Sequence, residues 1–160
     1  MVTAPLSKTA ATATVALIGN PNTGKTTLFN GLTGLSQQVG NFPGVTVERK
    51  VGRMQLDQGR RIDLLDLPGT YSLAAHSPDE MIAVDVLLGQ QQGVEPVDAV
   101  LAIVDASNLK RNLYLVSQLL ETGLPVVVAL NMIDVAEDRG IRIDVQALSS
   151  RLGEIGRAHV

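Results

Sequence analysis

Residues 19–26 read G-N-P-N-T-G-K-T, and this stretch constrains the fold more than any other part of the chain. It follows the apolar run 15–18 and precedes a segment with helical spacing, so it joins a strand to a helix. Gly19 and Gly24 permit a turn in which successive backbone N–H groups face one anion. The positive end of the helix adds to the same point. The stretch therefore predicts a phosphate-binding loop.

Two side chains in this loop have specific chemistry. Lys25 supplies a full positive charge to the outer phosphates, and the Thr26 hydroxyl is placed to ligate Mg²⁺. The plainer alternative is a glycine-rich turn with a chance lysine. The motifs that follow along the chain argue against that alternative.

The composition excludes several other classes of protein. The chain has 160 residues, of which 45% are hydrophobic, enough for one domain with a core. Its net charge is −3, so nucleic acid is not a predicted partner. It has no cysteine, which removes disulfides and thiolate metal sites. No apolar run is long enough to cross a membrane and no secretory signal is recognisable, so we expect this piece to be soluble.

Strand-like and helix-like patterns alternate along the chain. This alternation predicts an α/β fold with a mostly parallel sheet, one antiparallel edge strand and helices on both faces. Residues 35–48 are predicted to form a loop, and Gly59 a hairpin turn. The predicted strands are 15–18, 45–54, 61–66, 99–104 and 126–130, and the predicted helices are 25–33, 78–88, 108–122 and 145–152.

The two ends of the chain have different character from the middle. Residues 1–13 are small and polar, which is typical of a flexible leader. Residues 14–153 form the predicted nucleotide-binding domain. Residues 154–160 have no strand or helix periodicity, and their back-translation can be written as a common sequencing-adapter oligonucleotide. We therefore expect them to be non-native read-through.

Two further motifs follow predicted strands. D-x-x-G occupies Asp66 to Gly69, where the carboxylate can hold Mg²⁺ through water and the glycine N–H can meet a γ-phosphate. N-x-x-D occupies Asn131 to Asp134. Its carboxylate can accept from both N1–H and the exocyclic amine of guanine, whereas adenine offers no such pair. Each motif alone is a common turn, but three in this order predict a guanine-nucleotide site.

The segments between these motifs are candidate switches. Thr46 lies between the phosphate-binding loop and D-x-x-G, where a hydroxyl can complete a Mg²⁺ shell only when a γ-phosphate is present, so it is the candidate for switch I. Residues 70–79, which we call switch II, follow D-x-x-G. This segment begins with Thr70 rather than a water-positioning glutamine. We therefore expect slow intrinsic hydrolysis, with the attacking water oriented by backbone groups or bound water.

Four stretches together resemble one family, the N-terminal G domain of ferrous iron transport protein B (FeoB). They are N-P-N-T-G-K-T-T-L-F-N from Asn20, V-G-N-F-P-G-V-T-V-E-R-K from Val39, D-L-P-G-T-Y-S-L from Asp66 and V-D-A-S-N-L from Val104. The second and fourth are the most specific. The resemblance implies a P-loop GTPase (Ras-like) fold and a K⁺ ion placed by Asn22 beside the phosphates.

The resemblance also implies features outside this sequence. In the family, a helical spacer and a membrane-spanning permease follow the G domain, at the cytoplasmic face of the bacterial inner membrane, and a homo-oligomer of the full protein is left open. The family's fifth nucleotide motif belongs after Gly153 and is missing here. We therefore expect the last strand and helix to be missing, nucleotide binding to be weak and stability to be marginal.

The predicted site comprises four overlapping sets. Catalysis is assigned to Lys25, Asn22, Thr46 and Gly69, Mg²⁺ binding to Thr26, Thr46 and Asp66, and K⁺ binding to Asn22. The predicted GTP/GDP-binding residues are Gly19, Asn20, Pro21, Asn22, Thr23, Gly24, Lys25, Thr26, Thr27, Gly44, Val45, Thr46, Asp66, Leu67, Pro68, Gly69, Asn131, Met132 and Asp134.

The leading interpretation is the GTP-hydrolysing switch domain of a prokaryotic ferrous iron transporter, with GTP/GDP, Mg²⁺ and K⁺ as ligands. One alternative is a ribosome-assembly or tRNA-modifying GTPase, which the acidic balance disfavours. Another is a nucleotide-dependent interaction module with incidental hydrolysis. The domain has no cysteine and His76 is its one credible histidine, so we expect no contact with iron.

Overall fold

The computed structural model describes residues 12–153 and 156–159, and the side chains up to residue 153. Within this part, no helix combines the length and apolar character needed to cross a bilayer. The elements in chain order are β1 (Thr12–Gly19), α1 (Lys25–Thr33), β2 (Gln37–Asn41), β3 (Glu48–Gln55), η1 (Asp57–Gly59), β4 (Arg61–Asp66), α2 (Pro78–Leu87), β5 (Ala99–Asp105), η2 (Ala106–Asn108), α3 (Leu109–Glu121), β6 (Val126–Asn131), α4 (Ile133–Asp138), α5 (Val145–Leu152) and β7 (Gly156–His159).

These strands form one sheet in the order β2-β3-β4-β1-β5-β6-β7. β1 lies at its centre, parallel to both β4 and β5, and β6 continues the parallel part. β3 runs antiparallel to β4 and to β2, as predicted for that edge. Because β1, β4, β5 and β6 are parallel, their carboxyl ends meet at one edge of the sheet. The loops that carry the predicted motifs all leave from this edge.

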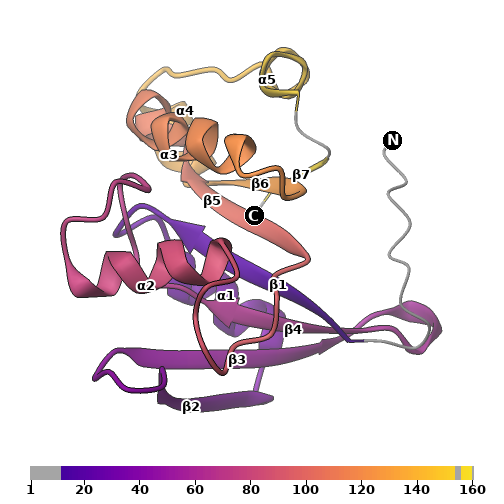
Figure 1. Cartoon of the computed structure of the whole chain (residues 1–160). Helices are drawn as coiled ribbons and strands as arrows, with labels where there is room; N and C mark the ends of the chain where they lie inside the picture. The colour runs from indigo at the N-terminus through magenta and orange to yellow at the C-terminus, as the bar shows by residue number, and fades with distance from the viewer. Residues whose placement is uncertain (1–11, 154–155, 160) are drawn as a thin grey trace.

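Helices cover both faces of the sheet (Figure 1). Successive residues of β1 point to opposite faces, as the two-residue period of a strand requires. Leu17 packs in a cluster with Phe29 of α1, whereas Ala16 and Ile18 pack in a larger cluster with residues of α2 and α3. Each fully buried large side chain contributes about 1.5–3 kcal/mol relative to its exposed state. The two clusters hold β1, and so the start of the phosphate-binding loop, from both sides.

Two helix boundaries follow the local signals in the sequence. α1 ends at Gly34, which has φ +56° and donates its N–H to the Asn30 carbonyl at 2.9 Å. α2 begins after Ser77, whose side chain accepts from the Glu80 N–H at 3.2 Å, with Pro78 in the first turn. The boundary at Ser77 fixes where switch II ends and α2 begins.

Some predicted boundaries were wrong. β2 lies inside the predicted loop 35–48. Most of its residues are exposed, so no burial pattern marks it, and backbone hydrogen bonds to β3 hold it instead. α4 was not predicted, because six residues are too few to show helical periodicity. β1 begins at Thr12, where it pairs with Arg61, so the last two residues of the predicted leader belong to the sheet.

The end of the chain also differs from expectation. The sequence predicts no final strand, yet Gly156–His159 forms β7, parallel to β6. Without β7, the outer edge of β6 would present unpaired backbone groups, and an extended segment of almost any sequence can pair with such an edge. Residues 1–11, 154–155 and 160 lie outside the described part. The assignments of a leader and of a read-through tail therefore stay predictions.

Gly52 in β3 has no room for a side chain. A Cβ at this position would lie 2.1 Å from the Thr33 Cγ2 atom of α1. We expect Gly52→Ala to lower the free energy of unfolding by roughly 1–3 kcal/mol, because α1 must move away from the sheet. The measurement is equilibrium urea unfolding.

The matched control is Gly31→Ala. This residue lies within α1, and a Cβ there meets nothing within 4 Å. Alanine is the better helix former, so this variant should be more stable by about 1 kcal/mol. Equal stability of Gly52→Ala and the parent chain would contradict the packing described for α1 on β3.

Candidate nucleotide-binding site

The predicted phosphate-binding loop connects the end of β1 to the start of α1. Two of its residues have left-handed backbone conformations, Asn22 with φ +62° and Gly24 with φ +88°. Asparagine is among the few residues with a side chain that adopt this conformation readily, and glycine adopts it without penalty. Asn22 is exposed, so its amide is available at the outside of the loop.

Asn131, at the end of β6, is in direct contact with this loop. Its Nδ2 donates to the Thr23 carbonyl at 2.8 Å. A Cβ at Gly24 would lie 2.2 Å from the same nitrogen, so the amide occupies the space that any side chain there would need. The structure therefore joins the predicted phosphate loop to the predicted base-recognition motif, 108 residues apart in sequence.

The rest of N-x-x-D continues from this contact. Met132 has φ +56°, an uncommon conformation for a long side chain, and it turns the chain from β6 into α4. Asp134 is exposed in the first turn of α4. Because a carboxylate in the first turn of a helix is favoured by the exposed N–H groups, its negative charge is stabilised there. The motif presents this carboxylate to solvent at the loop edge of the sheet.

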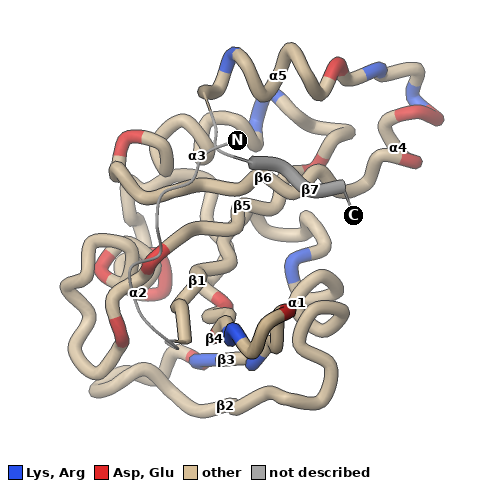
Figure 2. Tube along the Cα trace, turned by 90° about the vertical axis from the view of Figure 1, so that its right-hand side faces the viewer, with Lys and Arg blue, Asp and Glu red and all other residues tan. Residues whose placement is uncertain are grey.

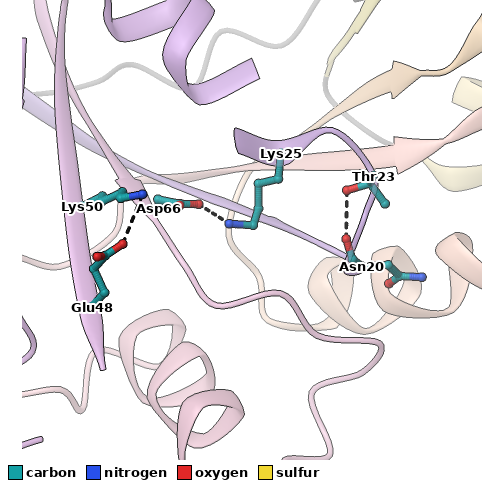
Figure 3. A network of polar contacts seen from close by, with 6 residues as sticks. All are labelled: Asn20, Thr23, Lys25, Glu48, Lys50 and Asp66. Carbon is teal, nitrogen blue, oxygen red and sulfur yellow. Dashed lines mark hydrogen bonds and ion pairs between the residues drawn. The ribbon is translucent and has the colours of Figure 1, made fainter. Parts of the chain in front are cut away.

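Lys25 and Asp66 form an ion pair (Figure 3). Lys25 opens α1 and Asp66 ends β4, and both side chains are 15% exposed. The nearby pair of Lys50 and Glu48, 3.1 Å apart, lies on β3 and is more exposed. Thr26, beside Lys25, is exposed. The predicted phosphate ligand and one predicted Mg²⁺ ligand are thus in contact, with their charges compensating each other.

D-x-x-G also lies against the phosphate loop. Asp66 pairs with Leu17 in the register of β4 and β1, and the Thr70 N–H donates to the Gly19 carbonyl at 3.0 Å. Pro21 faces Gly69, and a Cβ added at this glycine would lie 3.4 Å from the proline. The structure therefore brings the second motif to the first, as the strand order predicts.

The side chain of Asn20, the second residue of the loop, is buried. It is 3% exposed, and neither polar atom of its amide has a hydrogen-bond partner within the described residues. Figure 3 shows this amide directed away from Lys25. The Asn20 carbonyl accepts from the Thr23 hydroxyl at 2.9 Å, which stabilises the turn. Within the described residues, the hydrogen bond that Asn20 makes inside the loop is therefore a backbone one.

The switch I candidate Thr46 directly follows a turn. Phe42, Pro43, Gly44 and Val45 form a β-turn in which Gly44 has φ +77° and the Val45 N–H donates to the Phe42 carbonyl at 3.3 Å. Phe42 is buried, while Thr46 is exposed and makes no described hydrogen bond to Lys25 or Asp66. Its proposed place in a Mg²⁺ shell stays a prediction.

Switch II is held by a buried threonine and a glutamate. Thr70 is fully buried, and its hydroxyl donates to the Ser72 carbonyl at 2.7 Å and lies 3.2 Å from the Glu80 carboxylate. Glu80 also accepts from the His76 N–H at 2.7 Å. That backbone hydrogen bond, followed by the one from Thr70, lowers the pKa of the Glu80 carboxyl from its ordinary value of 4.5. The carboxylate form therefore stabilises the end of switch II.

A cavity of about 640 Å³ lies beside α4, lined by Ile133, Val145 and neighbouring residues. None of its lining residues belongs to the predicted site. The predicted site residues lie instead on loops at the edge of the sheet. Within the described residues, no cluster of three or more histidine, aspartate or glutamate side chains is placed to hold a metal.

The sequence profile of the family described as ferrous iron transport protein B matches residues 13–155. The chain belongs to this family. It is 56% identical over 144 residues to the Fe(2+) transporter FeoB of Salmonella typhimurium, covering 88% of this chain and 18% of that relative. The chain thus spans less than a fifth of the length of this FeoB relative.

Two solved FeoB structures support the fold. The cytosolic domain of L. pneumophila FeoB is 51% identical and superposes with a TM-score of 0.83, covering 92% of this chain and 60% of that one. A mutant of S. thermophilus NFeoB bound to mGDP is 50% identical with a TM-score of 0.81, covering 93% and 55%. The predicted P-loop GTPase fold of the FeoB G domain is confirmed.

Two contacts at this site and the role of Glu80 were not predicted from the sequence. The Asn131–Thr23 hydrogen bond and the Lys25–Asp66 ion pair join residues from different motifs, so no local sequence pattern predicts them. The role of Glu80 could have been predicted from the sequence. Ser77 to Glu80 has the S-x-x-E spacing of a helix capping box, which indicates a carboxylate that reaches back to the preceding backbone.

The lowered pKa of Glu80 gives a pH dependence with a defined sign. A carboxyl whose pKa is lower in the folded than in the unfolded protein stabilises the fold at pH values above its ordinary pKa. This contribution is lost as the pH falls through the lowered pKa. We expect the local protection of the His76 amide against hydrogen exchange to decrease as the pH falls below about 4.5. Glu80→Gln should show less protection at neutral pH and little further change in that interval. The same acid dependence in both proteins would contradict the role of Glu80.

Proposed function

We propose that this chain is the GTP-binding and GTP-hydrolysing switch domain of a ferrous iron transporter. The observation that carries the proposal is the Asn131–Thr23 contact, because it joins the predicted guanine-selecting motif to the predicted phosphate-binding loop. The nucleotide in the S. thermophilus relative adds support. Catalysis would be in-line attack of water on the γ-phosphate, assisted by positioning and by stabilisation of charge.

The phosphate end of the nucleotide would be held by the backbone of residues 19–26 and by Lys25. The turn at Gly24 and the start of α1 orient N–H groups toward one point. The guanine would be selected by Asp134, whose exposed carboxylate can accept two hydrogen bonds from its edge. Asn131 would act by fixing the distance between the phosphate-binding loop and Asp134.

The residues present also fit Mg²⁺. A threonine hydroxyl and a carboxylate, at Thr26 and Asp66, are oxygen donors of the kind this ion prefers. The ion pair gives a further reason. If Lys25 turns to the phosphates, Asp66 loses its cation while remaining mostly buried, which is costly unless another cation replaces it. Mg²⁺, when bound, would supply that charge and stabilise the charge of the reacting phosphates.

The hydrolytic rate is proposed to be slow. The Thr70 hydroxyl is buried and already hydrogen-bonded within switch II, so it supports no role as a water-orienting side chain. Backbone groups beside Gly69 are then left to orient the water. We assign K⁺ to the exposed Asn22, whose amide oxygen would hold the ion beside the phosphates in place of an arginine finger.

The place of this domain in the cell is part of the proposal. It would lie at the cytoplasmic face of the bacterial inner membrane, followed in the full protein by a helical spacer and a permease that carries Fe²⁺. The RNA-dependent alternative is disfavoured by the charge distribution, since Lys and Arg are scattered near β3, α1 and α5 (Figure 2). The net charge of −3 agrees with this.

We expect GTP turnover to be several-fold faster in K⁺ than in Na⁺. The experiment assays the protein in each salt, with Asn22→Ala alongside. The variant should lose the K⁺ stimulation and retain the slow basal rate, because the phosphate contacts of Lys25 remain. Equal turnover in both salts would remove the role of Asn22, and no turnover in either would refute the proposed function.

A further inference from the structure

The face of α3 that meets switch II has no part in the site described so far. Gln118 Oε1 accepts a hydrogen bond from the Leu73 backbone N–H at 2.8 Å, across 45 residues of sequence. The guanidinium carbon of Arg111 lies 4.1 Å from the centre of the Tyr71 ring. Arg111 and Gln118 are seven residues apart, two turns along one face of the helix. Switch II therefore lies along this face of α3.

These contacts lie between the two other points at which switch II is held. At its start, the Thr70 N–H donates to the Gly19 carbonyl. At its end, Glu80 accepts from the His76 N–H. Between these points, α3 supplies the Gln118 side chain as acceptor for one backbone N–H and Arg111 for one cation–π contact, which is attractive even when partly exposed.

We infer that Gln118 and Arg111 are positioning residues for GTP hydrolysis. By holding Leu73 and Tyr71 on α3, they fix the backbone of Gly69 and Thr70 against the phosphate loop. No side chain at position 70 is free to orient water, so the rate depends on where this backbone lies, and small displacements slow such reactions strongly. The inference rests on the proposed function, because it concerns hydrolysis at that site.

The composition of the chain provides a direct probe of this contact. It has no tryptophan and two tyrosines, Tyr71 and Tyr114. In a Tyr114→Phe background, intrinsic tyrosine fluorescence therefore reports only on Tyr71, which is 41% exposed in the docked arrangement. Acrylamide quenching of that fluorescence measures how well α3 covers the ring.

Two pairs of variants separate positioning from general stability. Gln118→Leu removes the acceptor at similar size, and Gln118→Glu keeps an acceptor oxygen at the same place. Arg111→Gln removes the charge above Tyr71, and Lys110→Gln makes the same change of charge at the adjacent exposed residue. Each is measured for Tyr71 quenching, for GDP affinity and for kcat with GTP.

We expect Arg111→Gln to raise Tyr71 quenching roughly twofold, since the ring loses the guanidinium above it. Gln118→Leu should raise it as well, because Leu73 is released from α3 and Tyr71 lies two residues before it. Both variants should lower kcat roughly three- to tenfold, because the backbone beside the phosphates is less well placed. GDP affinity should stay within about twofold, since the phosphate and base contacts lie elsewhere. Gln118→Glu and Lys110→Gln should resemble the parent.

Two results would overturn the inference. The first is unchanged quenching and kcat in Gln118→Leu and Arg111→Gln. The second is increased quenching with an unchanged kcat, which would make the contacts structural only. Failure of the proposed function is recognised separately, because the unsubstituted chain would then fail to hydrolyse GTP, and the inference would fall with it.

Discussion

The absence of a side chain at Gly24 is the constraint on which the rest of the site depends. The left-handed backbone there turns the loop into α1, and the Asn131 amide fills the space that a Cβ would take. From that position it donates to the Thr23 carbonyl. One residue without a side chain thus lets the end of β6 reach the loop that follows β1, although β5 lies between the two strands.

The charges of the site are arranged to compensate one another before any ligand is considered. Lys25 and Asp66 come from α1 and β4 and form a mostly buried ion pair. Removing one partner of such a pair is costly, because the other charge stays without compensation. In the proposed function, a phosphate that binds Lys25 would therefore arrive with a cation for Asp66. This ties the proposed binding of nucleotide to that of Mg²⁺ through a contact that is present in the structure.

Much of the fold could be predicted because its signals are local. The glycine-rich loop, the apolar strands β1, β5 and β6, and the caps at Ser77 and Gly34 all lie within short stretches. β2 was missed because it is exposed at the edge of the sheet, and α4 because it is short. β7 was missed because its pairing uses backbone groups, which carry no sequence pattern.

The candidate site was predictable in its parts and less so in its connections. Strand order brings Asp66, Gly69 and Asn131 to one edge of the sheet with Lys25, and the motifs predicted this. The contacts between motifs depend on where side chains from distant segments meet, as with Gln118 and Leu73. Such pairs have no fixed spacing along the chain, so no motif could reveal them.

The most direct test of this account is a calorimetric titration of the protein with GDP and with ADP in the presence of Mg²⁺. Both nucleotides carry the same diphosphate, so a difference between them reports on the base. The account predicts that GDP binds at least roughly tenfold more tightly, because Asp134 pairs with guanine and is left without a partner by adenine. Asp134→Asn should remove most of this difference. Equal affinity for GDP and ADP would contradict the central claim that the loop after β6 selects the base.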